Sequence, residues 1–284
     1  MHLNRFQNSI ALAKASWQVL RDDKQLALLP LLSLVASLLI AVSLLIPAAI
    51  IAHDGSGTYS AKPVDWILAA IGYLVLTYVV VFFNAALVYA ADRHLHGERI
   101  TLGEAIHAAS SRAGVLVPWV VVSATVSIVL RAIEERAGIV GRIVGAFAGM
   151  AWSVVTFLVL PILVVEGIGP IDAVKRSGEL FRRTWGENLI ANAGIGLATL
   201  IVGFVGAVPL FLLIAVGGPV AIVGIAALVV WLVAVGLVSA TLTGILQTAL
   251  YRFATGETLP GFDATLLRSS FRQRGTRGTG TWIG

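Results

Sequence analysis

The chain contains no cysteine among its 284 residues. Disulfide bonds, thiolate metal sites and thiol nucleophiles are therefore excluded, although this absence says nothing about the cellular compartment. Charged residues are also scarce, because Asp, Glu, Lys and Arg make up 12% of the chain against 58% for hydrophobic residues. A soluble domain with this composition would leave a very large apolar surface in water. The composition predicts an integral membrane protein.

Six long apolar runs account for this composition, and none of them carries a charge in its middle. A helix needs about 20 apolar residues to cross a hydrocarbon core ~30 Å thick. The runs of sufficient length are 26–52, 66–91, 114–130, 143–165, 189–216 and 219–251. Residues 1–25 are polar and lack the pattern of a cleaved signal peptide, so we expect the first run to be retained. We predict one membrane domain over residues 1–272 and a flexible basic tail over 273–284.

Basic residues collect on one side of the predicted spans. They precede the first run and follow the second, fourth and sixth runs, whereas the opposite side receives only Lys62, Arg131, Arg136 and Arg142. The positive-inside rule then predicts a multi-pass protein of the cell membrane with both termini in the cytoplasm. The net charge of +5 lies beside anionic lipid headgroups in this arrangement. We therefore expect lipid partners and no nucleic-acid binding.

Short amphipathic segments follow alternate runs, and they resemble one another. Residues 97–105 align without a gap with residues 256–264. Thr101 and Glu104 fit a capping box, and Pro170 suits the first turn of a helix. Helices that lie in the membrane interface are predicted over about 4–21, 101–113, 170–185 and 261–271. The expected fold is all-α, with six transmembrane helices in three pseudo-repeated hairpins, each preceded by a cytoplasmic amphipathic elbow helix.

Both ends of the chain carry motifs that resemble those of a known family. The first is Ala15-Ser16-Trp17-Gln18-Val19-Leu20-Arg21-Asp22-Asp23-Lys24-Gln25-Leu26, followed by Leu29-Pro30-Leu31-Leu32-Ser33. The second is Ala249-Leu250-Tyr251-Arg252-Phe253-Ala254-Thr255-Gly256, followed by Gly261-Phe262-Asp263 and Leu266-Leu267-Arg268. With the span count between them, they are similar to the domain-of-unknown-function 6159 family of prokaryotic six-span membrane proteins. The resemblance implies the six-span fold, and it implies no activity and no catalytic residues.

The basic residues of the cytoplasmic side form the first candidate site, which we call the collar. Arginine binds phosphate groups well, and tryptophan settles at headgroup depth. The collar would therefore bind anionic lipid or a partner membrane protein. Its predicted members are Lys175, Arg176, Arg182, Arg183, Trp185, Arg93, Arg252 and Arg268.

The interior of the predicted spans contains few residues that could bind a ligand or take part in catalysis. A membrane-embedded enzyme or a proton-coupled transporter would need ionisable groups within the bilayer. Asp92 and Glu166 lie at span ends, where water or Arg93 can satisfy them, so we expect no enzyme. Uncharged polar residues within spans link helices through hydrogen bonds, and they leave open an alternative, a transporter or channel for a weakly polar or lipid-like solute. The amides that would line such a path are Asn84, Asn192 and Gln247.

Two further patterns have structural interpretations. His94 and His96 lie near acidic residues, but alternate residues point apart on a helix, so we expect no metal site and no other cofactor. Small residues four apart allow helix backbones to approach closely. Gly141, Gly145 and Gly149 form such a stripe, either inside one bundle or at a homodimer interface. The leading hypothesis is a non-enzymatic membrane module that binds through its collar.

Overall fold

The structure is a computed structural model, and it describes residues 14–52, 63–136, 138–185 and 191–257. Every regular element in these ranges is helical, beginning with residues 14–22. The elements that follow are η1 (Lys24–Ala27), α2 (Leu28–Ala52), α3 (Pro63–Leu95), α4 (Leu102–Ser111), α5 (Ala113–Arg136), α6 (Gly138–Thr156), α7 (Val159–Val165), α8 (Pro170–Trp185), α9 (Ala191–Val216) and α10 (Gly218–Ala254).

In the described part of the chain, six helical segments are long and apolar enough to cross a membrane. They are Lys24–Ile46, Val64–Leu95, Ala113–Glu135, Gly141–Val165, Thr199–Val216 and Gly218–Ala254. Each corresponds to one of the predicted runs, so the protein is membrane-embedded and multi-pass. The fourth run differs in being broken between Thr156 and Val159. Proline explains the break, because Pro161 has no N–H to donate to the carbonyl of Phe157.

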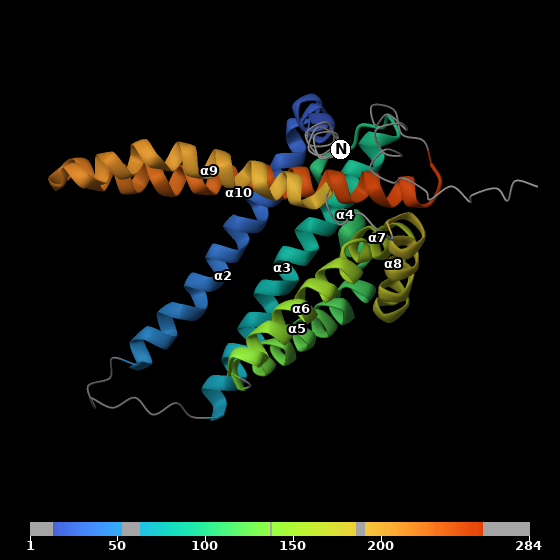
Figure 1. Ribbon diagram of the computed structural model, residues 1–284, viewed down its shortest axis with the longest axis horizontal. Coiled ribbons are helices and arrows are strands. Elements are labelled where there is room, and N and C mark those ends of the chain that lie inside the picture. The colour runs from blue at the N-terminus through green and yellow to red at the C-terminus, as the bar shows by residue number, and fades with distance from the viewer. Residues whose placement is uncertain (1–13, 53–62, 137, 186–190, 258–284) are drawn as a thin grey trace, which may run out of the picture.

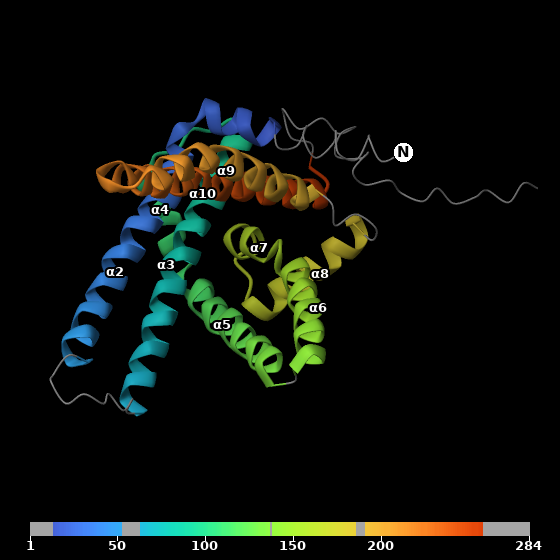
Figure 2. The same ribbon diagram turned by 60° about the vertical axis from the view of Figure 1, so that its left-hand side comes forward.

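The six helices form three pairs of neighbours: α2 packs on α3, α5 on α6, and α9 on α10. The first two pairs extend to the same side, whereas α9 and α10 run across the end of α2 and α3 in both views (Figures 1 and 2). The sequence did not predict this crossing. It arises because α10 has a nearly continuous buried stretch only near its C-terminal end, over residues 241–251.

The buried core lies at one end of the spanning helices. It is built from residues 85–91 of α3, 158–164 of α7 and 245–251 of α10, together with Leu26 and Leu29. Away from this end, the helices expose large apolar side chains, such as Leu39 (67% exposed) and Phe204 (73% exposed). Lipid tails accommodate such surfaces at no hydrophobic penalty. We call the end that holds the core and the ionised side chains described below the charged end.

Two short amphipathic helices lie beside the core, α4 against α3 and α8 against α7 and α6. The capping box of α4 is confirmed, because Thr101 Oγ1 accepts from the Glu104 N–H at 3.3 Å and Glu104 Oε2 accepts from the Thr101 N–H at 2.6 Å. Helix α8 begins at Pro170, as predicted. Of the predicted N-terminal helix 4–21, residues 14–21 are described and helical, and residues 4–13 lie outside the described residues. The predicted helix 261–271 and the tail 273–284 lie outside the described residues.

Candidate functional site

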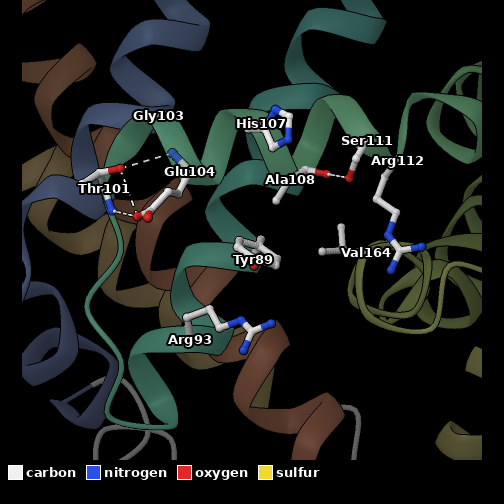
Figure 3. A pocket seen from close by; sticks show the side chains of 10 residues that line it. All are labelled: Tyr89, Arg93, Thr101, Gly103, Glu104, His107, Ala108, Ser111, Arg112 and Val164. Atoms are coloured by element: carbon white, nitrogen blue, oxygen red, sulfur yellow. Dashed lines mark hydrogen bonds between the residues drawn. The ribbon is translucent and has the colours of Figure 1, made fainter.

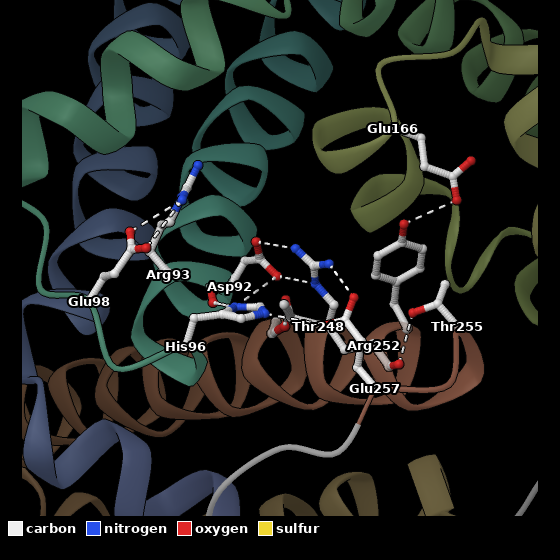
Figure 4. A network of polar contacts seen from close by, with 11 residues as sticks. Asp92, Arg93, His96, Glu98, Glu166, Thr248, Arg252, Thr255 and Glu257 are labelled. Atoms are coloured by element: carbon white, nitrogen blue, oxygen red, sulfur yellow. Dashed lines mark hydrogen bonds and ion pairs between the residues drawn. The ribbon is translucent and has the colours of Figure 1, made fainter.

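A buried ion pair joins the ends of α3 and α10. Arg252 Nε donates to Asp92 Oδ1 at 2.6 Å, and Arg252 Nη2 donates to Asp92 Oδ2 at 2.7 Å (Figure 4). The two side chains are only 17% and 7% exposed, respectively. Paired N–H groups on a carboxylate make a strong and directional contact. The partner of Asp92 is thus Arg252, and not Arg93 as the sequence suggested.

Further polar contacts extend this ion pair. Arg252 Nη1 donates to Glu257 Oε1 at 2.8 Å, and His96 Nε2 lies 3.2 Å from Glu257 Oε2. His96 Nδ1 lies 2.6 Å from the carbonyl oxygen of Asp92. Both of these oxygens are hydrogen-bond acceptors, so His96 links the end of α3 to Glu257. Glu257, which the sequence did not single out, therefore holds Arg252 and His96 together.

A second set of contacts ties α10 to the segment between α7 and α8. Tyr251 Oη donates to Glu166 Oε1 at 3.0 Å, and Arg176 Nε lies 3.4 Å from the same oxygen (Figure 4 shows Glu166). Glu166 thus has partners on two helices. The charged end is therefore crosslinked by ionised groups on α3, α8 and α10.

The turns that end α3 and α10 have the same geometry. Gly97 and Gly256 have φ of 81° and 93°, a conformation that glycine adopts without steric strain. The N–H of the next residue, Glu98 or Glu257, donates to the carbonyl of Arg93 or Arg252 at 3.0 Å. Each turn also carries an Arg–Glu ion pair, at 3.2 Å for Arg93–Glu98 and at 2.8 Å for Arg252–Glu257.

Arg252 and Arg93 differ in the partner of the guanidinium edge that Nε and Nη2 form. Asp92 fills the Nε and Nη2 edge of Arg252. Arg93 has no such carboxylate, and its Nε is buried without a hydrogen-bond partner among the described residues. The guanidinium of Arg93 instead lies 5.3 Å from the centre of the Tyr89 ring. Arg93 therefore has Tyr89 as a neighbour where Arg252 has a carboxylate.

A pocket of about 710 Å³ opens beside Arg93. Arg93 and Arg112 both direct their guanidinium groups toward the space next to Tyr89 and Val164 (Figure 3). The Arg112 guanidinium occupies the space that a Cβ at Gly167 would need. The pocket is lined by Tyr89, Arg93, Thr101, Gly103, Glu104, His107, Ala108, Ser111, Arg112 and Val164.

Glu104 is the one carboxylate in the lining of this pocket, and the capping box engages it. Hydrogen bonds from the Thr101 backbone and side chain lower the pKa of Glu104 below its usual range. These bonds direct the carboxylate toward the start of α4. The lining is therefore cationic overall, and its chemistry suits an anionic group such as a phosphate.

The predicted collar residues have different environments. Arg252 is fully engaged inside the protein, Arg176 contacts Glu166, and Lys175 Nζ lies 3.4 Å from Asp172 Oδ1 on exposed helix surface. Arg182 is exposed, and Arg93 lines the pocket. Arg183 and Trp185 belong to α8, but their side chains lie outside the description, as does all of Arg268.

Sequence reasoning did not single out Tyr89, His107 or Arg112 as site residues. The signal for Arg112 was its position directly between two helices on the basic side. No sequence pattern places these three residues around one pocket, because α3, α4 and α5 come together only in the folded chain.

A second pocket, of about 550 Å³, lies between α3, α5, α9 and α10. Asn84 and Gln247, two of the three amides predicted to line a solute path, both line it. Among the residues that the structure describes, neither amide makes a hydrogen bond. The side chain of the third amide, Asn192, lies outside the description.

Comparison with known proteins places the chain in a family. The model of a family of unknown function (DUF6159) matches residues 63–261, from the start of α3 to beyond α10. The chain belongs to this family. No curated protein and no solved structure matches the chain. The family match includes both pockets and the Asp92–Arg252 ion pair.

Within this family member, the glycine stripe of α6 lies partly against α5. Gly141 and Gly145 are buried, and a Cβ at Gly145 would overlap the side chain of Glu134. A Cβ at Gly149 would meet nothing within 4 Å. The close approach therefore occurs at Gly145, within one chain.

The histidines of α3 have separate partners. His94 Nδ1 lies 3.7 Å from Asp23 Oδ2, whereas His96 contacts Glu257. In the described part of the chain, no group of three or more His, Asp or Glu residues is arranged to hold a metal ion.

Proposed function

We propose that the protein is a non-enzymatic membrane module that binds the phosphate of anionic lipids at its basic, cytoplasmic face. The observation that carries this proposal is the pocket in which Arg93 and Arg112 face the same space (Figure 3). Two guanidinium groups can bind phosphate oxygens through paired hydrogen bonds. His107 and Ser111 add further polar groups to the same lining.

The comparison of the two matching turns supports this use of the pocket. At Arg252, an aspartate supplied by α3 neutralises the free edge of the guanidinium. At Arg93, the equivalent aspartate is absent, and the adjoining space is open. An external anion would take the role at Arg93 that Asp92 takes at Arg252. This parallel also supports the proposal that the hairpins and their elbow helices are pseudo-repeats.

The location of the pocket fits lipid headgroups. It lies at the charged end, where α3 leaves the hydrophobic span and α4 begins. Amphipathic helices of this kind lie in the membrane interface. The exposed Lys175 and Arg182 of α8 would add surface attraction of about 1 kcal/mol each. A partner membrane protein, or a second copy of the chain, would contact the same face in the alternative form of the hypothesis.

Native mass spectrometry of protein extracted with its lipids tests this proposal. The double variant Arg93→Gln/Arg112→Gln should retain phosphatidylglycerol about tenfold less well, because each charge-assisted hydrogen bond contributes ~1.5–3 kcal/mol. The matched control is Arg131→Gln/Arg142→Gln, which removes two exposed arginines far from the pocket and should retain the lipid as the wild type does. Equal retention by both variants would show that the pocket does not bind anionic lipid.

A transporter or channel for a weakly polar solute is the second candidate function. The specific observation in its favour is the pocket that Asn84 and Gln247 line together. Transport would require that this pocket open in turn to each side of the membrane. Solute flux in liposomes would distinguish this function from lipid binding alone.

A further inference from the structure

Asn84 and Gln247 are unusual because they are polar, lie within spanning helices and lack partners. Asn84 belongs to the span Val64–Leu95, and Gln247 belongs to the span Gly218–Ala254. Neither makes a hydrogen bond with another described residue, and both line the pocket of about 550 Å³. An amide in hydrocarbon without hydrogen bonds is strongly unfavourable. The two groups therefore require a partner from outside the described chain.

Two of the hydroxyl groups in this pocket already donate hydrogen bonds within the protein. Thr199 Oγ1 donates to Ser239 Oγ at 2.9 Å, and Thr156 Oγ1 donates to the Trp152 carbonyl at 2.7 Å. These contacts leave the two amides and the hydroxyl of Thr243, which also lines the pocket, as the groups available to a ligand. Each amide offers both a donor and an acceptor, so the matching ligand group also donates and accepts, as a hydroxyl does.

The lining of the pocket limits the charge of its occupant. It contains no Asp, Glu, Lys or Arg. An ionised ligand would have no counter-charge there and would be unstable within the membrane. Its apolar wall includes Val88, Trp119, Phe157 and Leu160. Trp119 is held by stacking on Trp152, with ring centres 6.2 Å apart.

Asn84 lies inside the apolar span Val64–Leu95, near the charged end. Asn84 precedes Asp92 by eight residues on α3, which corresponds to about 12 Å along the helix axis. A ligand that places hydroxyl groups at this depth has its polar part just inside the interface and its chain alongside the apolar wall. The volume lies within the range of ~300–1,000 Å³ that is usual for small-molecule sites.

We propose that this pocket binds an uncharged, hydroxyl-bearing lipid of the acylglycerol class, held by hydrogen bonds to Asn84 and Gln247. The glycerol hydroxyls satisfy the two amides, and the acyl chain lies against Trp119, Phe157 and Leu160. The site is separate from the Arg93–Arg112 pocket and takes an uncharged ligand, whereas that pocket is proposed to take an anionic one. This proposal can therefore be tested independently of the proposal that the protein binds anionic lipid.

Photo-crosslinking of the purified full chain tests this inference with a defined probe. The probe is 1-oleoylglycerol that carries a diazirine in its acyl chain, and the charged comparison is the corresponding oleoyl phosphatidylglycerol. We expect the neutral probe to label the peptides that contain Trp119, Phe157 and Leu160, because the acyl chain that carries the diazirine lies against these residues. An excess of unlabelled 1-oleoylglycerol should compete with this labelling.

The decisive variant is Asn84→Leu/Gln247→Leu, which keeps the side-chain size and removes the hydrogen-bonding groups. Labelling should fall about tenfold, because the ligand hydroxyls lose their partners. The matched control, Thr77→Val, removes a hydroxyl that bonds only to its own helix, at 2.7 Å from the Tyr73 carbonyl, and should label normally. Arg93→Gln/Arg112→Gln should also label normally with the neutral probe, which separates the two sites.

Three outcomes would overturn the inference. These are labelling of the double variant at the wild-type level, labelling of the wild type that unlabelled 1-oleoylglycerol does not reduce, and preferential labelling by the phosphatidylglycerol probe. Size and thermal transition in detergent verify that each variant is folded. If the double variant fails this check, the single variants Asn84→Leu and Gln247→Leu provide the same comparison.

Discussion

At the scale of single residues, the two matching arginines have separate tasks. Arg252 is bound on one edge by Asp92 and on the other by Glu257, so its charge is used to fasten α10 to α3. Arg93 has one exposed acidic partner and an open pocket. The same local sequence thus produces a structural arginine in one place and a candidate binding residue in the other.

Removal of one partner from the buried ion pair should destabilise the protein. Asp92→Asn leaves Arg252 partly unpaired, and Arg252→Gln leaves Asp92 unpaired, and either change should cost ~3–5 kcal/mol. The double variant Asp92→Leu/Arg252→Met should be closer to the wild type, since it leaves no buried charge without a partner, and Glu257 is 41% exposed and keeps His96. Thermal unfolding in detergent measures all three. A double variant less stable than both single variants would contradict this account.

The capping box makes the stability of α4 depend on pH. The pKa of Glu104 is lowered in the folded state from an ordinary value of about 4.5. Its carboxylate therefore stabilises the helix fully above that ordinary value, and the stabilisation is lost as the pH falls through the lowered pKa.

Hydrogen exchange of the α4 amides, compared between wild type and Glu104→Gln at each pH, measures this effect. The wild type should be better protected near neutral pH, and the difference should shrink below about pH 4. A difference that stayed constant down to strongly acidic pH would exclude the carboxylate as its cause.

At this scale the sequence predicted local features well and long-range partners poorly. Thr101 and Glu104 are three residues apart, so a capping box is visible in the sequence. Asp92 and Arg252 are 160 residues apart, and Arg93 was the nearer candidate. The packing of the helices decides which acidic side chain pairs with which basic side chain. The sequence pattern of a single segment does not contain that information.

At the scale of elements, the lengths of the apolar runs determined the predicted number of spanning helices. Six runs with uncharged centres can only be satisfied as helices in a bilayer, and six such helices are present. The sequence predicted three hairpins but not their relative directions, and α9 and α10 cross the others (Figure 2). Lipid-facing helices are apolar all round, so their sequence carries little information about which face meets a neighbour.

The crossing of α10 over α3 depends on a glycine. A Cβ at Gly244 would lie 2.6 Å from Leu87 Cδ2, so Gly244→Val should force the helices apart and cost ~1–3 kcal/mol. Gly236→Val is the matched control on the same helix, since a Cβ there meets nothing within 4 Å. Thermal unfolding should separate the two variants, and equal transitions would show that close packing at Gly244 is unimportant.

At the scale of the whole molecule, the absence of cysteine makes the topology directly measurable. We expect Ser110→Cys on α4 to react with a membrane-impermeant maleimide only after cells are permeabilised. Glu135→Cys, at the far end of α5, should react in intact cells. Val220→Cys, at the turn between α9 and α10, should also react in intact cells if this hairpin crosses the bilayer.

The result at Val220 decides how the third hairpin lies. Reaction of Val220→Cys only after permeabilisation would show that α9 and α10 do not cross, and would leave four spans. Reaction of Ser110→Cys in intact cells would instead reverse the proposed orientation. Both residues are exposed in the structure, so lack of reaction in either case would not come from burial in the protein.

The composition of the core has a consequence for biosynthesis. Leu20, Leu26 and Leu29 pack in one cluster with Ile245, Leu250 and Tyr251, so the first and last described parts of the chain meet there. Until α10 has been synthesised, this cluster is incomplete and the Asp92 carboxylate lacks its guanidinium. The contacts of α10 with α2 and α3 are therefore the last of this core to form during synthesis, whereas α3 can already pack on α5 and α7.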